Sequence, residues 1–265
     1  MSPRKVALVT AGSAGLGAAI SRMLALDLGM SVIINYSNNA ERAEALVQDL
    51  RNSYSSVSPS PLPAPSFHAI RADLSGPKSE AIRLVAEAAA AAGGRLDVVI
   101  SNAGWTRVRD FSDLDDGVDE DDWDRCFGAN VKAHLWLFHA ARPWLEEANA
   151  REEGAAVFVS TASVAGCKPS GSSLPYAVTK AAQIHLIKSL AVIAAPTIRV
   201  NSVSPGLLLT DWGLSFPPER LEAIKTQQKL QRFATVEDVA EQVKSFVRSK
   251  SVTGQNAVVD AGFSL

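Results

Sequence analysis

The alternation of short apolar runs with longer helical patterns is the feature that most constrains the fold of this chain. Seven runs have the length and composition of β-strands, and helical patterns fill the intervals between them. Several of these runs are apolar on both faces, which is typical of a parallel sheet that helices cover on both sides. Because crossovers between parallel strands are right-handed, the pattern predicts an α/β fold built on one doubly wound parallel sheet. We expect its strands at residues 6–10, 31–35, 67–72, 97–102, 155–160, 198–203 and 256–260.

Length and hydrophobicity are compatible with this fold. The chain has 265 residues, of which 47% are hydrophobic, and this is enough for one large α/β domain or two small ones. The alternating pattern resumes on both sides of a Ser- and Pro-rich segment at residues 52–66. We therefore interpret that segment as a surface loop and expect a single domain over residues 1–265.

Charge and cysteine content limit the location and the partners. The net charge of −2 gives no reason to expect nucleic acid or an anionic membrane as a partner. With only two cysteines, a disulfide framework is not expected, and the reducing cytoplasm is the default location. The apolar run at residues 6–9 is too short for a signal peptide, and no apolar stretch is expected to reach the roughly 18 residues of a membrane span.

A glycine-rich turn, Thr-Ala-Gly-Ser-Ala-Gly-Leu-Gly, joins the first strand to a helix that starts near Leu16. Glycines let the backbone approach a ligand, and the helix N-terminus offers free N–H groups to a pyrophosphate. A tight turn without a ligand could look the same, but its place at the first strand–helix junction favours a dinucleotide site. The candidate contacts are Thr10, Gly12, Ser13, Gly15, Leu16 and Gly17.

The end of the second strand bears on the choice of cofactor. Tyr36, Ser37 and Asn38 follow it, and no acidic residue occurs before Glu41. An acidic residue here would bind the ribose 2′-hydroxyl of NAD, so its absence favours NADP, although no arginine or lysine in this stretch would clasp the 2′-phosphate.

The next two strands also end in candidate cofactor contacts. Asp73, which precedes Leu74, could accept a hydrogen bond from an adenine amino group or could cap a helix. Asn102, Ala103 and Gly104 follow the fourth strand, where they suit a cofactor-facing position or an ordinary turn.

Tyr176 and Lys180 are the strongest candidates for chemistry. They are four residues apart in a helical segment, so both side chains project from one face. An ammonium group near a phenol should lower the phenol pKa from its ordinary value of about 10, so that it could trade a proton with a substrate oxygen. Ser163, at the carboxyl end of the fifth strand, could hydrogen-bond the same oxygen. Tyr-x-x-x-Lys also occurs by chance on many helices. Whether this pair is catalytic therefore depends on the motifs in the rest of the chain.

Residues 123–147 form a long helical pattern, which we expect to bend near Pro143. This segment is apolar on more than one side, whereas a surface helix should show one stripe. We expect its outer face to pack against another subunit in a homodimer or homotetramer; burial within the monomer is the alternative. Asn130 lies among these apolar residues, where it could bond a neighbouring backbone or hold a water in a proton path.

After the sixth strand come Pro205, Gly206 and Thr210, and residues 207–232 have poor strand character. We interpret 207–232 as a short helical lid over a pocket. Thr235 is the expected cap of the next helix. The acidic run 113–124 is interpreted as a solvated loop and helix start, without a function.

Together these residues resemble the short-chain dehydrogenase/reductase family over nearly the whole chain. The resemblance rests on motifs in the family's order, namely the turn 10–17, Ser101-Asn102-Ala103-Gly104, the set Asn130, Ser163, Tyr176 and Lys180, Ile198-Arg199-Val200-Asn201, Pro205-Gly206 with Thr210, and the closing strand from Thr253 to Asp260. It implies a Rossmann-type fold in which a nicotinamide passes a hydride to a carbonyl carbon. Tyr176 would exchange the proton, Lys180 would tune it and bind the nicotinamide ribose, Ser163 would steady the oxyanion, and Asn130 would support a water. Thr210 and the backbone near it would hold the carboxamide.

Several positions depart from the family's pattern. Ala11 and Ala261 stand where the family has glycines, and Ser101 replaces an asparagine. Ala14 takes the place of a basic residue that many NADP-dependent members carry, while Tyr36 takes the place of the acid of NAD-dependent members. The missing basic residue at Ala14 leaves the choice between NADP and NAD open. The missing acidic residue at Tyr36 points to NADP.

The expected function is NADP(H)-dependent hydride transfer between nicotinamide and a ketone or secondary alcohol, with no metal. Trp105, Trp212 and Phe216 near the pocket make a bulky apolar substrate plausible. A redox-neutral enzyme on the same fold, such as an epimerase, dehydratase or cyclase, is the alternative. A silent binding scaffold is disfavoured because the serine, tyrosine and lysine are all present.

Overall fold

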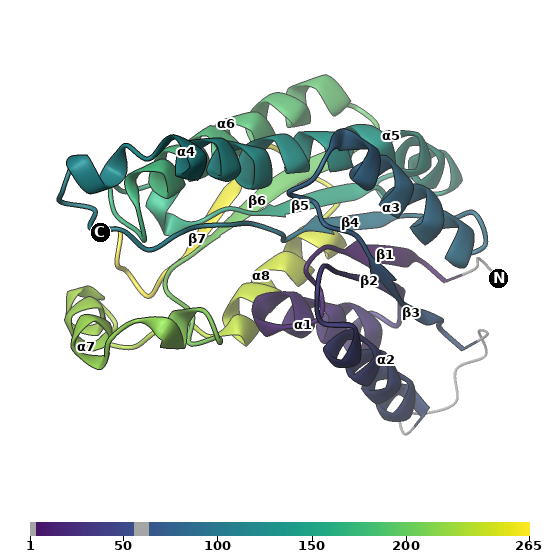
Figure 1. The fold of residues 1–265 in the computed structure, drawn as a ribbon. Coiled ribbons are helices and arrows are strands. Elements are labelled where there is room, and N and C mark those ends of the chain that lie inside the picture. Colours follow the sequence, from purple (N-terminus) through teal and green to yellow (C-terminus); the bar gives the residue numbers. More distant parts are fainter. Residues whose placement is uncertain (1–3, 56–63) are drawn as a thin grey trace.

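The computed structural model describes residues 4–55 and 64–265, and its centre is a parallel sheet of seven strands in the order β3-β2-β1-β4-β5-β6-β7 (Figure 1). Every neighbouring pair is parallel, and all seven predicted strands are present. The strands are β1 (Val6–Val9), β2 (Ser31–Tyr36), β3 (Phe67–Arg71), β4 (Val98–Ser101), β5 (Val157–Thr161), β6 (Arg199–Pro205) and β7 (Asn256–Val259).

Helices cover both faces of the sheet, as the apolar strands require. The layer on one face consists of α1 (Gly15–Arg22), α2 (Ala40–Ser55) and α8 (Val236–Arg248), and the layer on the other consists of α3 (Lys78–Ala91), α4 (Glu120–Phe127), α5 (Ala133–Arg151) and α6 (Leu174–Ala194) (Figure 1). Successive side chains of a strand point to opposite faces. Leu8 of β1 accordingly packs in one hydrophobic core, while Ala7 and Val9 pack in the other.

The strand order reverses at β1, which lies between β2 and β4. In open sheets of this kind, the crevice outside the carboxyl ends at such a reversal is where ligands bind. The glycine-rich turn after β1 and the segments after β4 and β5 all start at this edge. The fold therefore brings the candidate residues to one place.

The long helix predicted at 123–147 is interrupted at a different point from the expected one. A wide π-helical turn, η3 (Gly128–Lys132), separates α4 from α5, and α5 runs on through Pro143. Such turns are frequent at functional sites because they redirect a side chain. Here the turn contains Asn130, so the irregularity falls at the candidate site rather than at the proline.

Two other sequence interpretations need correction. Residues 52–55 of the predicted loop form the last turn of α2, residues 56–63 lie outside the described part of the chain, and β3 begins at Phe67. The acidic run is not wholly solvated, because Asp122 is buried and its carboxylate pairs with Arg109 at 2.8 Å and with Arg107 at 2.9 Å.

The segment predicted as a lid, residues 207–232 (the lid segment), has little regular structure, and the helix after it starts at the predicted cap. Residues 207–232 contain only the short helices η5 (Gly213–Ser215) and α7 (Pro218–Gln227). The Thr235 hydroxyl accepts a hydrogen bond from the Asp238 N–H at 3.1 Å, and the Asp238 carboxylate accepts one from the Thr235 N–H at 3.0 Å. This reciprocal cap starts α8 and confirms Thr235 as its N-cap.

Helix α6 corrects the expectation about apolar stretches. Its 21 residues, Leu174–Ala194, are long and apolar enough to match a membrane-spanning helix by length and composition. Half of its apolar window is buried inside the protein, where it packs against the sheet. The core helix of an α/β fold passes the same length and composition test.

Candidate active site

Tyr176 and Lys180 face one site from the first turns of α6. The helix begins at its cap Ser173, whose hydroxyl accepts a hydrogen bond from the Tyr176 N–H at 3.3 Å. Lys180 Nζ lies 5.6 Å from the centroid of the Tyr176 ring. The four-residue spacing therefore does place both side chains on one face, and Lys180 is almost completely buried there.

Ser163 reaches the same site from the carboxyl end of β5. It caps the short helix η4 (Val164–Gly166), and its hydroxyl accepts a hydrogen bond from the Ala165 N–H at 3.2 Å. A Cβ at Gly166 would lie 2.6 Å from the Lys180 carbonyl carbon, so only glycine allows η4 to pack this closely on α6. The close packing holds Ser163 within hydrogen-bonding reach of Tyr176.

Asn130 is buried, and the backbone of the segment after β4 uses its amide. The Asn130 side chain donates to the Trp105 carbonyl at 2.9 Å and accepts from the Trp105 N–H at 2.8 Å. A third contact joins its amide nitrogen to the Thr179 hydroxyl at 3.1 Å. A Cβ at Gly104 would lie 3.1 Å from the Asn130 oxygen and 3.5 Å from Lys180 Nζ, so Gly104 separates the two side chains. Of the two roles considered for Asn130, the structural bond to backbone is present.

A buried network of hydrogen bonds holds the Lys180 side chain in place. Its ammonium group donates to the Thr161 carbonyl at 3.1 Å and to the Gln183 side-chain oxygen at 2.9 Å. The Gln183 amide nitrogen in turn lies 2.7 Å from the Ser160 hydroxyl and 3.1 Å from His134 Nε2. His134 Nδ1 lies 2.6 Å from the hydroxyl of Ser101. Ser101 is thus one end of a hydrogen-bonded chain that leads to Lys180.

Burial controls the protonation of Tyr176, Lys180 and His134. It raises the pKa of Tyr176 to about 12, and the hydrogen bond with Ser163 only partly opposes this. Burial also lowers the pKa of Lys180 to about 7 and that of His134 to about 3, the latter with a contribution from the Lys180 charge. The prediction that the phenol pKa is lowered is therefore wrong for this structure, because burial of Tyr176 raises it and only the hydrogen bond with Ser163 opposes the rise.

The turn after β1 has the geometry of a phosphate-binding turn. A Cβ at Gly17 would lie 2.2 Å from the Ala11 carbonyl oxygen, and one at Gly12 would lie 2.8 Å from the Val9 oxygen, so both positions require glycine. Gly15 has a left-handed φ of +48°, and a Cβ there would lie 3.0 Å from the Thr210 methyl group. The turn is therefore tight enough to bring the N-terminus of α1 against a ligand.

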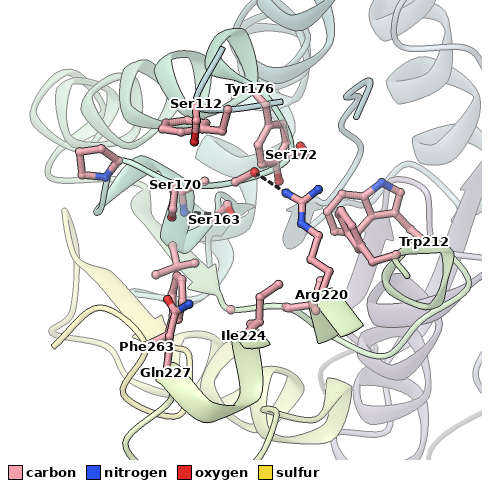
Figure 2. A pocket seen from close by; sticks show the side chains of 18 residues that line it. Ser112, Ser163, Ser170, Ser172, Tyr176, Trp212, Arg220, Ile224, Gln227 and Phe263 are labelled. Carbon is pink, nitrogen blue, oxygen red and sulfur yellow. Dashed lines mark hydrogen bonds between the residues drawn. The ribbon is translucent and has the colours of Figure 1, made fainter. Parts of the chain in front are cut away.

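Three adjoining pockets form a groove along this edge. The first, about 330 Å³, includes Asp73 and Gly104 in its lining. A second of about 300 Å³ is also lined by Gly104 and includes Tyr176 and Lys180. The third, about 390 Å³, is lined by Tyr176, Ser163 and residues of the lid segment (Figure 2). The residues present thus fit a dinucleotide that runs from the Asp73 end to Tyr176, with the third pocket left for a substrate.

The groove collects most of the predicted cofactor contacts, though not all. Those that line it are Ser37, Asn38, Asp73, Leu74, Asn102, Ala103, Gly104, Tyr176, Lys180 and Gly206. The predicted contacts that do not line it occupy the turn after β1, the first turn of α1, the ends of β2 and β6 and the segment after β6; they are Gly12, Ser13, Gly15, Leu16, Gly17, Tyr36, Pro205 and Thr210. Thr10 is completely buried, and its hydroxyl accepts from the N–H groups of Asn102 at 2.8 Å and Ala103 at 3.0 Å. Its role is to tie the first turn to the segment after β4.

Asp73 does not cap a helix, because α3 begins after Pro77. Its carboxylate instead accepts hydrogen bonds from the Ser75 N–H at 3.0 Å and the Ser75 hydroxyl at 2.7 Å. Asp73 lines the first pocket, so the adenine contact remains a prediction.

Sequence reasoning missed two arginines, one hydrogen-bonded to the segment after β2 and one in the third pocket. Arg71 Nε donates to the Ser37 carbonyl at 3.1 Å, which adds a basic group beside the end of β2. Its place near the end of the predicted strand at 67–72 is the signal that could have revealed it, and the structure pairs it with Tyr36 of the adjacent strand. Arg220, on the lid segment, lines the third pocket. No local motif marks Arg220, because the lid has no regular pattern.

Fold and site together define a dinucleotide-dependent enzyme of the doubly wound class. A sequence model of the short chain dehydrogenase family matches residues 5–220. The chain therefore belongs to the short-chain dehydrogenase/reductase family of oxidoreductases.

Individual proteins are similar over almost the whole chain. A protein named as ketoacyl reductase 2 of the granaticin polyketide synthase of Streptomyces violaceoruber is 36% identical over 262 residues, which cover 98% of this chain and 96% of that protein. A 3-oxoacyl-acyl-carrier-protein reductase of Staphylococcus aureus is 31% identical, with 99% of each chain covered. A crystal structure of a short chain dehydrogenase from Burkholderia cenocepacia in complex with NADP has a TM-score of 0.84 and 32% identity, with 98% of each chain covered.

Proposed function

We propose that this protein is an NADP(H)-dependent oxidoreductase that transfers a hydride between nicotinamide and a ketone or secondary alcohol. The observation that carries the proposal is the convergence of Ser163, Tyr176 and Lys180 where the dinucleotide groove meets the third pocket. A carbonyl group held in that pocket would lie against the phenol and the serine hydroxyl. The ketoacyl reductases among its relatives support a reaction at a carbonyl carbon.

Tyr176 acts as the proton donor in reduction. With a pKa raised to about 12, its phenol stays protonated at neutral pH and can give its proton to an alkoxide, which is a stronger base than a phenolate. The Ser163 hydroxyl steadies the developing oxyanion by hydrogen bonding.

Lys180 and Asn130 support the proton donor. The Lys180 ammonium group is fixed by Thr161 and Gln183, so its charge is placed 5.6 Å from the Tyr176 ring centroid without adjustment during the reaction. Asn130 holds the Trp105 backbone, and with it Gly104, against the lysine. A water carried by Asn130 would return a proton to the phenol after each turnover.

The dinucleotide, when bound, supplies the hydride. The turn 10–17 and the N-terminus of α1 would hold its pyrophosphate, Asp73 and Leu74 its adenine, and Asn102 to Gly104 its central part. Lys180 would bind the nicotinamide ribose, while Pro205, Gly206 and Thr210 would hold the carboxamide. Ser37 and Asn38, with Tyr36 in place of an acid and Arg71 nearby, favour NADP over NAD. The NADP complex of the Burkholderia cenocepacia structure supports that preference.

We infer that residues 207–232 act as a lid on a single domain that spans residues 1–265. Thr210 lies over Gly15, and Asp211 pairs with Arg42 of α2 at 3.0 Å, so this segment crosses the cofactor turn. Because that ion pair is largely exposed, it can open at little cost.

A homodimer or homotetramer is supported by apolar side chains on the outer faces of α5 and α6. Trp136 and Trp144 are only half-buried, and Val192 and Ile193 are exposed. Light scattering after size-exclusion chromatography measures the assembly. A reducing, cytoplasmic location is supported by the two cysteines, Cys126 and Cys167, which are both free.

The experiment that tests the proposed function follows cofactor absorbance while the protein is mixed with NADPH or NADH and a panel of ketones. We expect NADPH oxidation with at least one ketone, and slower oxidation of NADH. Tight cofactor binding without oxidation by any carbonyl would instead favour a redox-neutral reaction on the same fold.

A further inference from the structure

Arg220 is the feature of the third pocket that the proposed function leaves unused. It lies in the first turn of α7, and Figure 2 shows its side chain extending from the lid segment across the pocket towards the side that carries Tyr176 and Ser172. Its Nη2 group donates to the Gly171 carbonyl at 3.3 Å, and its guanidinium lies 4.8 Å from the centroid of the Phe216 ring. These two contacts fix the guanidinium inside the pocket.

The charge of Arg220 is uncompensated. Of the 18 residues that line this pocket in the described part of the chain, Arg220 is the only charged one. No carboxylate among residues 4–55 and 64–265 forms an ion pair with it. Its single long hydrogen bond and its stacking on Phe216 leave most of its five N–H donors available. A half-buried guanidinium of this kind can bind a carboxylate, which its planar fork can hold through two parallel hydrogen bonds.

Gly171 lies between the Arg220 guanidinium and the Tyr176 ring. Gly171, whose carbonyl holds Arg220, has a φ of +126°, and a Cβ there would lie 3.5 Å from Cδ1 of Tyr176 and 3.0 Å from the Ala165 Cβ. The positive φ and the close approach to Ala165 favour glycine here, and a Cβ would be in ordinary van der Waals contact with the phenol ring. The Arg220 guanidinium and the Tyr176 phenol both line this pocket, and Gly171 lies next to both of them. A carbonyl group that reacts at Tyr176 would therefore lie near the guanidinium.

The rest of the lining shows what else the ligand must contain. Phe111, Leu207, Ile224 and Phe263 provide apolar surface, and the pocket of about 390 Å³ is large enough for a small aromatic or aliphatic body. The hydroxyl of Ser172 is engaged with that of Thr106 at 2.7 Å, so it does not substitute for the charge of Arg220.

We propose that the substrate of this site is a keto acid, or the corresponding hydroxy acid, whose carboxylate binds Arg220 while its carbonyl group lies at Tyr176 and Ser163. This inference rests on the proposed function and sharpens the expectation of a bulky apolar substrate to a mainly apolar molecule with one anionic end. Arg220 is then a specificity-determining residue of the lid, and substrate binding draws the lid towards η4.

The test compares keto acids with their own methyl esters, which differ in little besides the charge. Phenylglyoxylate, 3-benzoylpropionate and 4-benzoylbutyrate are assayed beside their esters with NADPH, so that three distances between carbonyl and carboxylate are sampled. For at least one pair we expect kcat/KM for the acid to exceed that for the ester about 10- to 100-fold, the range for hydrogen bonds to a charged group. The excess should shrink at high ionic strength because salt screens the pair.

Two substitutions at Arg220 and one control complete the design. Arg220→Met should bring the acid-to-ester ratio of kcat/KM close to one, mainly through a higher KM for the acid, whereas Arg220→Lys should keep part of the ratio because it keeps the charge but loses the fork. Lys225→Met removes another cation of α7, one that pairs with Glu222 at 3.8 Å and does not line the pocket, and it should leave the ratio within twofold.

The possible failures are distinguishable. Equal rates for acids and esters in the unaltered protein, or a ratio that survives both Arg220 substitutions, would overturn the carboxylate site and leave the proposed function standing. No oxidation of NADPH or NADH by any ketone, charged or neutral, would contradict the proposed function, and the carboxylate site would fall with it.

Discussion

The side-chain oxygen of Gln183 lies 2.9 Å from Nζ of Lys180, one turn further along α6, and accepts a hydrogen bond from it. This contact connects the lysine of the site to the buried groups of His134, Ser160 and Ser101. Ser101 is the position at which this chain departs from the asparagine of the family's motif. The departure is therefore part of a connected set of polar side chains rather than an isolated change.

Gln183 should set the position and the protonation of Lys180. Gln183→Met removes the acceptor and should lower the pKa of Lys180 further, whereas Gln183→Glu places a negative charge beside it and should raise that pKa by about one unit. The alkaline limit of kcat/KM should move down in the first variant and up in the second, as measured from pH 6 to 10. An equal loss of kcat in both variants without any shift of the profile would show that Gln183 serves packing alone.

His134 should make the fold sensitive to acid. Burial lowers its folded-state pKa to about 3, so below its unfolded value of 6.5 the unfolded chain binds a proton that the folded protein does not. Stability then falls as the pH falls, by roughly 1.4 kcal/mol per unit, or about 2 kcal/mol from pH 6.5 to 5. Urea unfolding at several pH values measures this loss. His134→Gln should show a shallower loss over the same range, and identical slopes for the two proteins would contradict the prediction.

Two alanines stand in backbone conformations that favour glycine. Ala11 has a φ of 47° and Ala261 a φ of 54°, and both stand where the family has glycines. Left-handed backbone costs an L-residue roughly 1–2 kcal/mol, partly offset because glycine gains entropy in the unfolded chain. Ala11→Gly and Ala261→Gly should each raise the free energy of unfolding by about 0.5–1 kcal/mol. Ala223→Gly, on the exposed side of α7, is the control and should lower it by a similar amount; a loss of stability in all three would argue against relieved strain.

The residue after the buried part of β2 should decide between the two cofactors. Tyr36→Asp adds the carboxylate that would bind the ribose 2′-hydroxyl of NADH and repel the 2′-phosphate of NADPH. We expect the ratio of the dissociation constants, NADPH over NADH, to rise at least tenfold in fluorescence titrations. Tyr36→Phe is the matched control, since it keeps the ring without the charge. If the ratio of the two dissociation constants is unchanged in Tyr36→Asp, the ribose 2′-hydroxyl or 2′-phosphate does not bind near residue 36.

Much of the fold could be predicted from the sequence because the buried strands are apolar on both faces. The predicted limits of each strand differ from the observed ones by no more than two residues, as at β5, expected at 155–160 and observed at Val157–Thr161. The site residues could be placed by their motifs, since the turn after β1 and the Tyr176–Lys180 spacing specify local geometry. The break at Gly128–Lys132 was not predicted, because a π-helical turn has no distinct apolar pattern.

What escaped prediction depends on contacts between distant parts of the chain. His134 meets groups that are 33 and 49 residues away in the sequence, and no spacing rule brings such residues together. The direction of the Tyr176 pKa shift depends on burial, which a helical spacing does not reveal. Arg220 belongs to a lid without periodic pattern, so its place in the pocket could not be inferred from the residues around it.

The central claim is that Tyr176 donates the proton at a nicotinamide-dependent carbonyl site, and Tyr176→Phe tests it most directly. The measurement pairs NADPH-dependent turnover of the best ketone with the dissociation constant for NADPH in the same preparation. We predict that turnover falls at least 1,000-fold, in the upper part of the range for loss of general acid catalysis, while the dissociation constant changes less than threefold. Turnover within tenfold of the unaltered protein would contradict the role of Tyr176 and the account built on it.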